Sequence, residues 1–397
     1  MGTSKRLMSL FVGALAVCIL FASPRYSSSE APPPKDKYAD VHLNPNGFSP
    51  SSECGKCHKD IYSTWKNSLH AEAPNNFVFQ TAYLQAYFER GEEVRQVCLA
   101  CHAPIAALNA DFKLTGEITR EGINCDYCHS IAEVQPGGNG PHNRFEFGLV
   151  KNGPLQNVSS PVHKTRYNET FKESRFCWGC HEFETANGVK LIETYSEWAK
   201  GPYPAKGIHC QNCHMRKVSG KIVAEEVKAV PQKEISSHDI AGGHSLTQRE
   251  ESIGIKIAQV NRFKQKVEVT VDVTNKGAGH MIPTGIPSKK IVLQVFIQSK
   301  TGEVHQMHQK TYQKVMVDAN GEPVVHDSDL LLGKPVRILS DNRIAPLETR
   351  REKFTFFVPE EKDQKVSAAV FYSHTPRIVQ PSPIHIKLHE VQQAIGP

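Results

Sequence analysis

The chain has 397 residues, a formal net charge of +6 and 22% charged residues, which leaves room for two or three domains. Its Lys and Arg residues do not cluster in the sequence, so the small positive net charge does not indicate a nucleic-acid-binding protein.

The first residues have the layout of a secretory signal peptide. Lys5 and Arg6 precede the apolar run Leu7–Phe21, which is shorter than the ~20 residues that a membrane-spanning helix needs. We therefore expect residues 1–22 to be a signal peptide and the protein to be exported, to the periplasm or beyond the cell. An uncleaved membrane anchor is the alternative, because no clean A-x-A-like cleavage site follows the run.

Residues 23–50 are rich in Pro, Ser and charged residues and poor in apolar ones. This composition is typical of an extended, disordered tether rather than of a packed element.

Between Cys54 and His214 the pattern Cys-x-x-Cys-His occurs five times. A lone C-x-x-C pair could belong to a zinc site, a redox disulfide or an iron–sulfur cluster, but none of these needs a histidine directly after the second cysteine. Covalent haem attachment uses all three residues: two thiols form thioethers, and the imidazole is the proximal iron ligand. The positions are Cys54, Cys57 and His58; Cys98, Cys101 and His102; Cys125, Cys128 and His129; Cys177, Cys180 and His181; and Cys210, Cys213 and His214.

The sequence thus predicts five covalently bound c-type haems in a domain spanning residues 51–250. Every cysteine except Cys18 lies in a motif, so no structural disulfide is expected. So little polypeptide accompanies each haem that the haems must pack against one another and form much of the core, with mostly helical and irregular chain around them. Each ferric haem with its two propionates adds a charge of about −1, which cancels the positive balance of the chain.

Two helices are expected near the first motifs. Asp60–His70 places Ile61, Trp65 and Leu69 on one apolar stripe. Gln80–Arg90 is the second, and Gly91 follows it as a stop signal.

A second iron ligand would suit a haem to electron transfer, whereas an open side would let a substrate bind. His70 would lie about 18 Å from His58 along a helix, so it would serve a different haem. His142 and His163 lie in the long gap before the fourth motif, and His238 and His244 follow the last one. These five histidines match five haems, and His280, flanked by glycine and proline, is the rival candidate.

After about residue 250 the sequence shows short alternating runs of β-forming residues. This pattern predicts an antiparallel β-sandwich of immunoglobulin-like build over residues 251–397. The predicted strands are KVEVTVDVTN, KIVLQVFIQS, REKFTFFVP and KVSAAVFYS, with turns at KTGEV and DANGEP. We expect this module to position, dock or oligomerise the haem domain, and its other histidines to lie at the surface: His305, His308, His326, His374, His385 and His389.

Several stretches resemble, in order, the multihaem cytochromes grouped with the tetrahaem cytochrome of nitrifying bacteria and with hydroxylamine oxidoreductase. They are ECGKCHKDIYSTWKNSLHA, CLACHAP, EGINCDYCHSI, CWGCHEF and TYSEWAKGPYPAKGIHCQNCHM, and NKGAGHMIPTGIP and DNRIAPLETRREKFTFFVP resemble the sandwich module of exported members. The resemblance implies stacked and perpendicular haem pairs, mostly bis-histidine ligation, and electron transfer outside the cytoplasm. It implies His70, His142 and His163 as distal ligands and extends to His238 and His244. Five motifs, rather than four or eight, leave the place of the extra haem open.

The favoured function is an electron relay between redox protein partners: a quinol-side donor and a downstream oxidoreductase or extracellular acceptor. One alternative is an enzyme acting on a small nitrogen or sulfur species at one five-coordinate haem. Against it, every motif ends in His and no C-x-x-C-K occurs. A further alternative is a homo-oligomer or extracellular filament in which one subunit lends a histidine to its neighbour's haem.

Overall fold

The computed structural model describes residues 38–135, 140–229, 231–374 and 384–396. The expected signal peptide and the first part of the expected tether lie outside these residues, and residues 38–397 belong to one compact unit. Within the described ranges, no helix combines the length and apolar character needed to cross a membrane.

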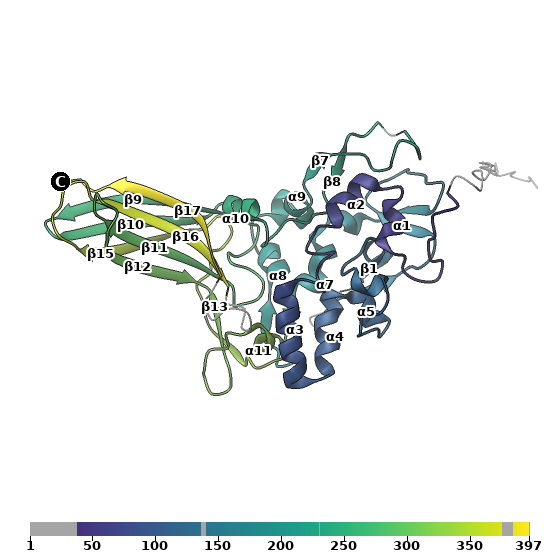
Figure 1. Ribbon diagram of the computed structural model, residues 1–397, viewed down its shortest axis with the longest axis horizontal. Coiled ribbons are helices and arrows are strands. Elements are labelled where there is room, and N and C mark those ends of the chain that lie inside the picture. Colours follow the sequence, from purple (N-terminus) through teal and green to yellow (C-terminus); the bar gives the residue numbers. More distant parts are fainter. Residues whose placement is uncertain (1–37, 136–139, 230, 375–383, 397) are drawn as a thin grey trace, which may run out of the picture. The chain divides into compact units, whose positions relative to one another are not determined.

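The part of the chain that carries the motifs is built from short helices joined by long loops (Figure 1). The helices are α1 (Ser51–Gly55), α2 (Lys59–Trp65), α3 (Phe77–Arg90), α4 (Glu93–His102), α5 (Pro104–Leu108), α6 (Cys125–His129), α7 (Trp178–His181), α8 (Thr194–Ala199), α9 (Cys210–His214) and α10 (Leu246–Ser252). Four small two-stranded sheets lie among them: β1 (Ile131–Gln135) with β2 (His142–Phe145), β3 (Val150–Gly153) with β4 (Lys164–Tyr167), β5 (Phe183–Glu184) with β6 (Lys190–Ile192), and β7 (Lys217–Ser219) with β8 (Glu234–Ser236).

The two predicted helices form, with different ends. Helix α2 stops at Trp65 rather than continuing to His70, because the Trp65 indole donates to the Ile123 carbonyl at 3.0 Å and the chain then turns to meet that segment. Helix α3 begins earlier than predicted, since the Asn76 side chain accepts from two amides of its first turn. It ends, as predicted, at Arg90 and is followed by Gly91, whose φ is 73°.

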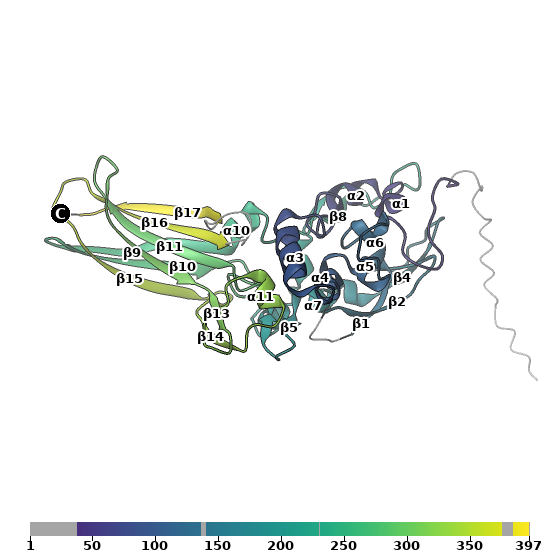
Figure 2. The ribbon, with the colours of Figure 1, turned by 60° about the horizontal axis from the view of Figure 1, so that its bottom comes forward.

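The C-terminal β-region contains two antiparallel sheets (Figures 1 and 2). One has the strand order β15–β10–β9 and the other β12–β11–β16–β17. The strands of these two sheets are β9 (Ile253–Phe263), β10 (Lys266–Asn275), β11 (Lys290–Gln298), β12 (Val304–Tyr312), β15 (Thr349–Phe357), β16 (Lys365–His374) and β17 (Ile384–Ala394). A further antiparallel pair joins β13 (Lys314–Val317) to β14 (Arg337–Asp341), and helix α11 (Asp327–Leu331) lies between these two strands in the sequence. The four predicted strands and both predicted turns are confirmed.

The two sheets share one hydrophobic core. In β10 the residues Val267, Val269, Val271 and Val273 are all buried, as the alternation of a strand with one buried face requires. They belong to a single cluster with side chains of β9, β11, β15, β16 and β17. This cluster is much larger than the apolar clusters of the motif-bearing part of the chain, which are small and separate. A further small cluster joins Val189 and Leu191 to Met316 and Leu330 of the β-region.

Candidate functional site

Each Cys-x-x-Cys-His motif lies on or beside a helical turn. The third, fourth and fifth motifs end in α6, α7 and α9, the second closes α4, and the first spans the end of α1. One helical turn places cysteines at i and i+3 on the same face. The histidine comes next and is the last residue of the helix in α4, α6, α7 and α9. The local fold therefore presents two thiols and one imidazole together, as covalent haem attachment requires.

Backbone carbonyls hold three of the five motif histidines in one tautomer. The Nδ1 atom of His58 pairs with the Ile222 carbonyl at 2.6 Å, and that of His129 pairs with the Asn152 carbonyl at 2.6 Å. His214 makes the same kind of bond to Ala241. A proton on Nδ1 leaves Nε2 with a free lone pair, which is the form that binds a metal.

Three further histidines face motif histidines. The ring centroids are 6.2 Å apart for His58 and His163, 6.3 Å for His70 and His181, and 6.4 Å for His214 and His280. Two metal–nitrogen bonds of about 2 Å, with about 1 Å from each nitrogen to its ring centre, predict a separation of about 6 Å across one metal ion. The three pairs therefore fit bis-histidine ligation of three haems.

The imidazoles of these centres are in surroundings that keep them neutral. Burial lowers the pKa of His70 to about 4 and that of His181 to about 3. It also lowers the pKa of His102 and His129 to about 4. Desolvation disfavours the imidazolium form, and the neutral imidazole is the one that can coordinate iron.

The other two motif histidines have no opposing imidazole within ring-contact distance among the described residues. His129 packs against Phe171 with 5.3 Å between ring centroids, and the half-buried His238 is among the nearby groups that lower the pKa of His129. His238 has its Nδ1 held by the Ser236 carbonyl at 2.8 Å, the same tautomer as the paired histidines. His102 stacks on Phe79 with 3.9 Å between ring centroids.

Two sequence candidates lie elsewhere. The His142 side chain is exposed on β2, opposite Gln135 of β1. His244 is exposed in the turn before α10. Its pKa is lowered by partial burial, and the motif histidine His214 is among the nearby groups that contribute, but no ring contact of His244 is seen among the described residues. Among the described residues, neither forms a ring pair with a motif histidine as His70, His163 and His280 do. One expectation is wrong: His374 is not at the surface but buried, with its Nε2 3.2 Å from Asp327.

The motifs are close together in space. The thiols of Cys54 and Cys125 lie close enough to shift each other's pKa values, as do those of Cys101 and Cys180 and those of Cys177 and Cys210. The Cys128 thiol lies close enough to Cys177 and Cys180 to raise their pKa values. The motif that ends in His181 thus neighbours the second, third and fifth motifs, and the third neighbours the first.

His280, the rival ligand candidate of the sequence, lies in the C-terminal β-region on the loop between β10 and β11. Glu197 of α8 holds this loop: it accepts from the Met281 amide at 3.2 Å and from the Thr284 hydroxyl at 2.7 Å. The same carboxylate pairs with the buried Arg343 at 2.6 Å. Sequence reasoning missed this anchor, since nothing near Glu197 in the chain marks it as a partner of residues so far away.

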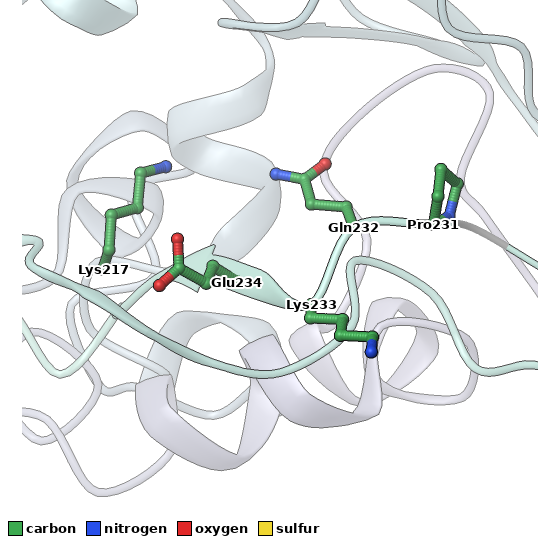
Figure 3. A pocket seen from close by; sticks show the side chains of 5 residues that line it. All are labelled: Lys217, Pro231, Gln232, Lys233 and Glu234. Carbon is green, nitrogen blue, oxygen red and sulfur yellow. The ribbon is translucent and has the colours of Figure 1, made fainter.

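A surface hollow of about 510 Å³ lies beside the β7–β8 hairpin. Figure 3 shows its lining side chains, which are Lys217, Pro231, Gln232, Lys233 and Glu234. The set offers neither an imidazole nor a thiol, so this hollow is not part of the haem-binding arrangement.

Comparison with known proteins agrees with this arrangement. Residues 53–130 match the family described as cytochrome c554 and c-prime. The fold is similar to that of a penta-haem cytochrome c552 from Thermochromatium tepidum, with a TM-score of 0.69 and 22% sequence identity over 87% of this chain and 99% of that one. A putative β-galactosidase from Bacteroides fragilis covers 37% of this chain and 16% of its own, with 12% identity and a TM-score of only 0.20. No curated protein matches the chain.

Proposed function

We propose that this multihaem c-type cytochrome binds five haems c and relays electrons through them between redox protein partners outside the cytoplasmic membrane. The observation that carries the proposal is the set of three opposed imidazole pairs, each joining a motif histidine to a histidine far away in the sequence. An iron held by protein on both faces has no open position for a substrate, which suits electron transfer.

The chain's own residues account for attachment and orientation. Haem c supplies one-electron redox chemistry when bound. The motif thiols would hold it covalently, and the carbonyl partners of Nδ1 would fix the orientation of each imidazole and raise its basicity. Because ligands on both faces stay in place in either redox state, little reorganisation would accompany each electron.

The close packing of the motifs supports a relay. Thiols of different motifs lie close together, so the groups attached to them would be neighbours as well. We infer a branched electron path between the haems of these motifs. It runs from the haem of the first motif to that of the third and on to that of the fourth, and from there to the haems of both the second and the fifth motif.

We further propose that the two C-terminal sheets form an immunoglobulin-like sandwich, supported by their single shared core. In this proposal the sandwich is more than a docking module, because its β10–β11 loop supplies His280 opposite His214. Export by the N-terminal segment, a quinol-side donor and a downstream oxidoreductase or extracellular acceptor remain parts of the proposal.

The experiment is haem quantification on the exported holoprotein, by pyridine haemochrome and intact mass, with low-temperature electron paramagnetic resonance on the same sample. Five attached haems with at least the His58, His181 and His214 centres low-spin are expected. Fewer than five attached haems, or most of the iron high-spin, would contradict the relay.

A further inference from the structure

The centre at His214 takes its two imidazoles from different parts of the molecule. His214 closes α9 of the motif-bearing part, whereas His280 lies on the β10–β11 loop of the β-region. The two rings are stacked, with 6.4 Å between centroids and an interplanar angle of 13°. A metal–nitrogen bond is only about 2 Å long, and a ligand has to be held to within about 0.5 Å. The loop must therefore be fixed relative to the motif.

On the loop side the contact is made by Glu197 of α8, a helix that lies where the two parts of the molecule meet (Figure 1). Its Oε2 atom accepts from the Met281 amide at 3.2 Å and from the Thr284 hydroxyl at 2.7 Å. Met281 follows His280 directly in the chain, and its carbonyl is the one that holds the His280 Nδ1 atom at 2.9 Å. The Glu197 carboxylate thus fixes the same segment that orients the His280 ring.

The other carboxylate oxygen of Glu197 pairs with a charge of the β-region. Oε1 lies 2.6 Å from the Arg343 Nη1 atom, and only 7% of the Glu197 side chain and 4% of the Arg343 side chain are exposed. The guanidinium also donates to the Pro283 carbonyl of the same loop at 3.2 Å and to both oxygens of Asp341. A buried ion pair adds little net stability, but a polar network whose members all have partners is rigid. The pair therefore keeps the carboxylate where the loop reaches it.

On the motif side the contact is made by Trp198, the residue after Glu197. Its indole donates to the Ile208 carbonyl at 2.9 Å, and the segment it holds leads directly into the fifth motif. The loop also lies against this indole, since a Cβ atom on Gly279 would be 3.4 Å from the Trp198 Cδ1 atom. Two neighbouring side chains of α8 thus connect the loop of His280 to the start of the fifth motif.

We infer that Glu197 is a positioning residue for the fifth haem: it holds His280 at bonding distance from the iron opposite His214, while Trp198 fixes the other half of the centre. The inference rests on the proposed five-haem function and adds to it the group that decides the coordination of one haem. Glu197 acts through the loop and not as a ligand. The β-region then supplies its histidine only while its loop is held by α8.

The test compares the holoprotein with Glu197→Ala, Glu197→Gln, His280→Ala and the control Glu193→Ala. Glu193 is also a carboxylate of the motif-bearing part that pairs with a buried cation of the β-region, Lys314, at 2.7 Å. Among the described residues it makes no hydrogen bond or ion pair with the loop of His280. Haem content is measured first, followed by the high-spin fraction from electron paramagnetic resonance, without and with added imidazole.

In Glu197→Ala the high-spin fraction should rise by about one fifth, as in His280→Ala, because one iron of five loses its second ligand. The double variant should show no larger rise than His280→Ala alone, and added imidazole should return the spectrum of each to that of the wild type. Glu197→Gln keeps an oxygen that can accept from Met281 and Thr284, so it should match the wild type. Glu193→Ala should match it as well.

Two results would overturn the inference and leave the five-haem relay intact. One is a wild-type spectrum for Glu197→Ala with five haems attached, and the other is an equal high-spin rise in Glu193→Ala. Should Glu197→Ala fail to accumulate, Thr284→Val decides, because it removes one loop contact and leaves the pair of Glu197 with Arg343 in place. Thr284→Val should raise the high-spin fraction above that of the wild type, and no rise would contradict the inference. A wild type with fewer than five haems, or an unchanged spectrum for His280→Ala, would instead count against the proposed function itself.

Discussion

Which nitrogen a histidine leaves free decides what the centre can bind. The Nδ1 atoms of His58, His129 and His280 are held by carbonyls at 2.6, 2.6 and 2.9 Å, so each ring presents Nε2. His70 is the exception, since its buried Nδ1 has no hydrogen-bond partner among the described residues. Its position depends instead on its backbone, whose carbonyl accepts from the Ile123 amide at 2.9 Å.

Substituting His70 by Ala should remove the ligand opposite His181 and leave five haems attached. The ring pair at 6.3 Å predicts that one low-spin haem becomes high-spin or water-ligated. Electron paramagnetic resonance with haem quantification checks this, and His142→Ala, at an exposed position, is the matched control. An unchanged spectrum for His70→Ala would remove His70 from the ligand set.

Acid should weaken the buried ion-pair network of Arg343. Burial alone would raise the pKa of Asp341, but the hydrogen bonds and charge of Arg343 outweigh it and hold the pKa of that carboxyl below its usual range. Because folding lowers the pKa of Asp341, its ionised carboxylate stabilises the folded state at pH values above the unfolded pKa, which is about 3.9. This stabilisation is lost as the pH falls through the folded pKa. Asp341→Asn should therefore lower the free energy of unfolding at pH 7 by about 1–2 kcal/mol. The free energy of unfolding of this variant should also decrease less than that of the wild type as the pH falls below ~4.

Chemical unfolding of the holoprotein between pH 7 and 3 measures that difference. Glu268→Gln serves as control, because Glu268 and its partner Lys266 are both exposed and surface pairs contribute little. A pH profile for Asp341→Asn that parallels the wild type would show that Asp341 does not carry this acid sensitivity.

At the scale of elements, the segments between helices place the ligands. Gly122 has a φ of 67°, and a Cβ atom there would lie 2.3 Å from the His70 carbonyl oxygen and 2.8 Å from that of Ala71. The segment before α6 can thus approach the turn after α2 only because residue 122 has no side chain. This contact decides where His70 lies after α2 has ended.

Gly122→Ala should push the His70 segment away from His181 and cost about 1–3 kcal/mol of stability, with part of one haem becoming high-spin. Gly207→Ala is the matched control: Gly207 lies in the left-handed region, with φ 64° and ψ 22°, but nothing lies within 4 Å of the added Cβ. It should lose only about 1 kcal/mol from backbone strain and keep its haem spectrum. Thermal unfolding and electron paramagnetic resonance would separate the two; equal spectra would show that Gly122 does not position His70.

At the scale of the whole molecule, the two parts of residues 38–397 differ in what holds them together. The C-terminal sheets share one large apolar cluster. The motif-bearing part has only small clusters, such as those around Ile105 and around Leu99, and between them lie thiols and imidazoles that haem would cover. Its stability should therefore depend on the haems.

Produced without haem attachment, the full chain should fold only in its β-region. Hydrogen exchange followed by mass spectrometry should find slow exchange in β10, β11 and β16 and fast exchange throughout α1–α9, because the small clusters cannot offset the conformational entropy of ordering that segment. The holoprotein is the control, with protection in both parts. A protected, cooperatively unfolding motif region in the apoprotein would contradict this.

The sequence by itself determined the attachment points, because thioether formation needs two cysteines and a histidine that are neighbours in the chain, and it determined the strands of the C-terminal region, because burial of one face imposes alternation. It could not decide the second ligands. His163 and His280 are opposed to motif histidines, whereas His142 is exposed on β2. A ligand pair joins residues that are distant in the chain, so its choice depends on backbone contacts such as that of Gly122 with His70 and of Glu197 with the loop carrying His280, which exist only once the chain has folded.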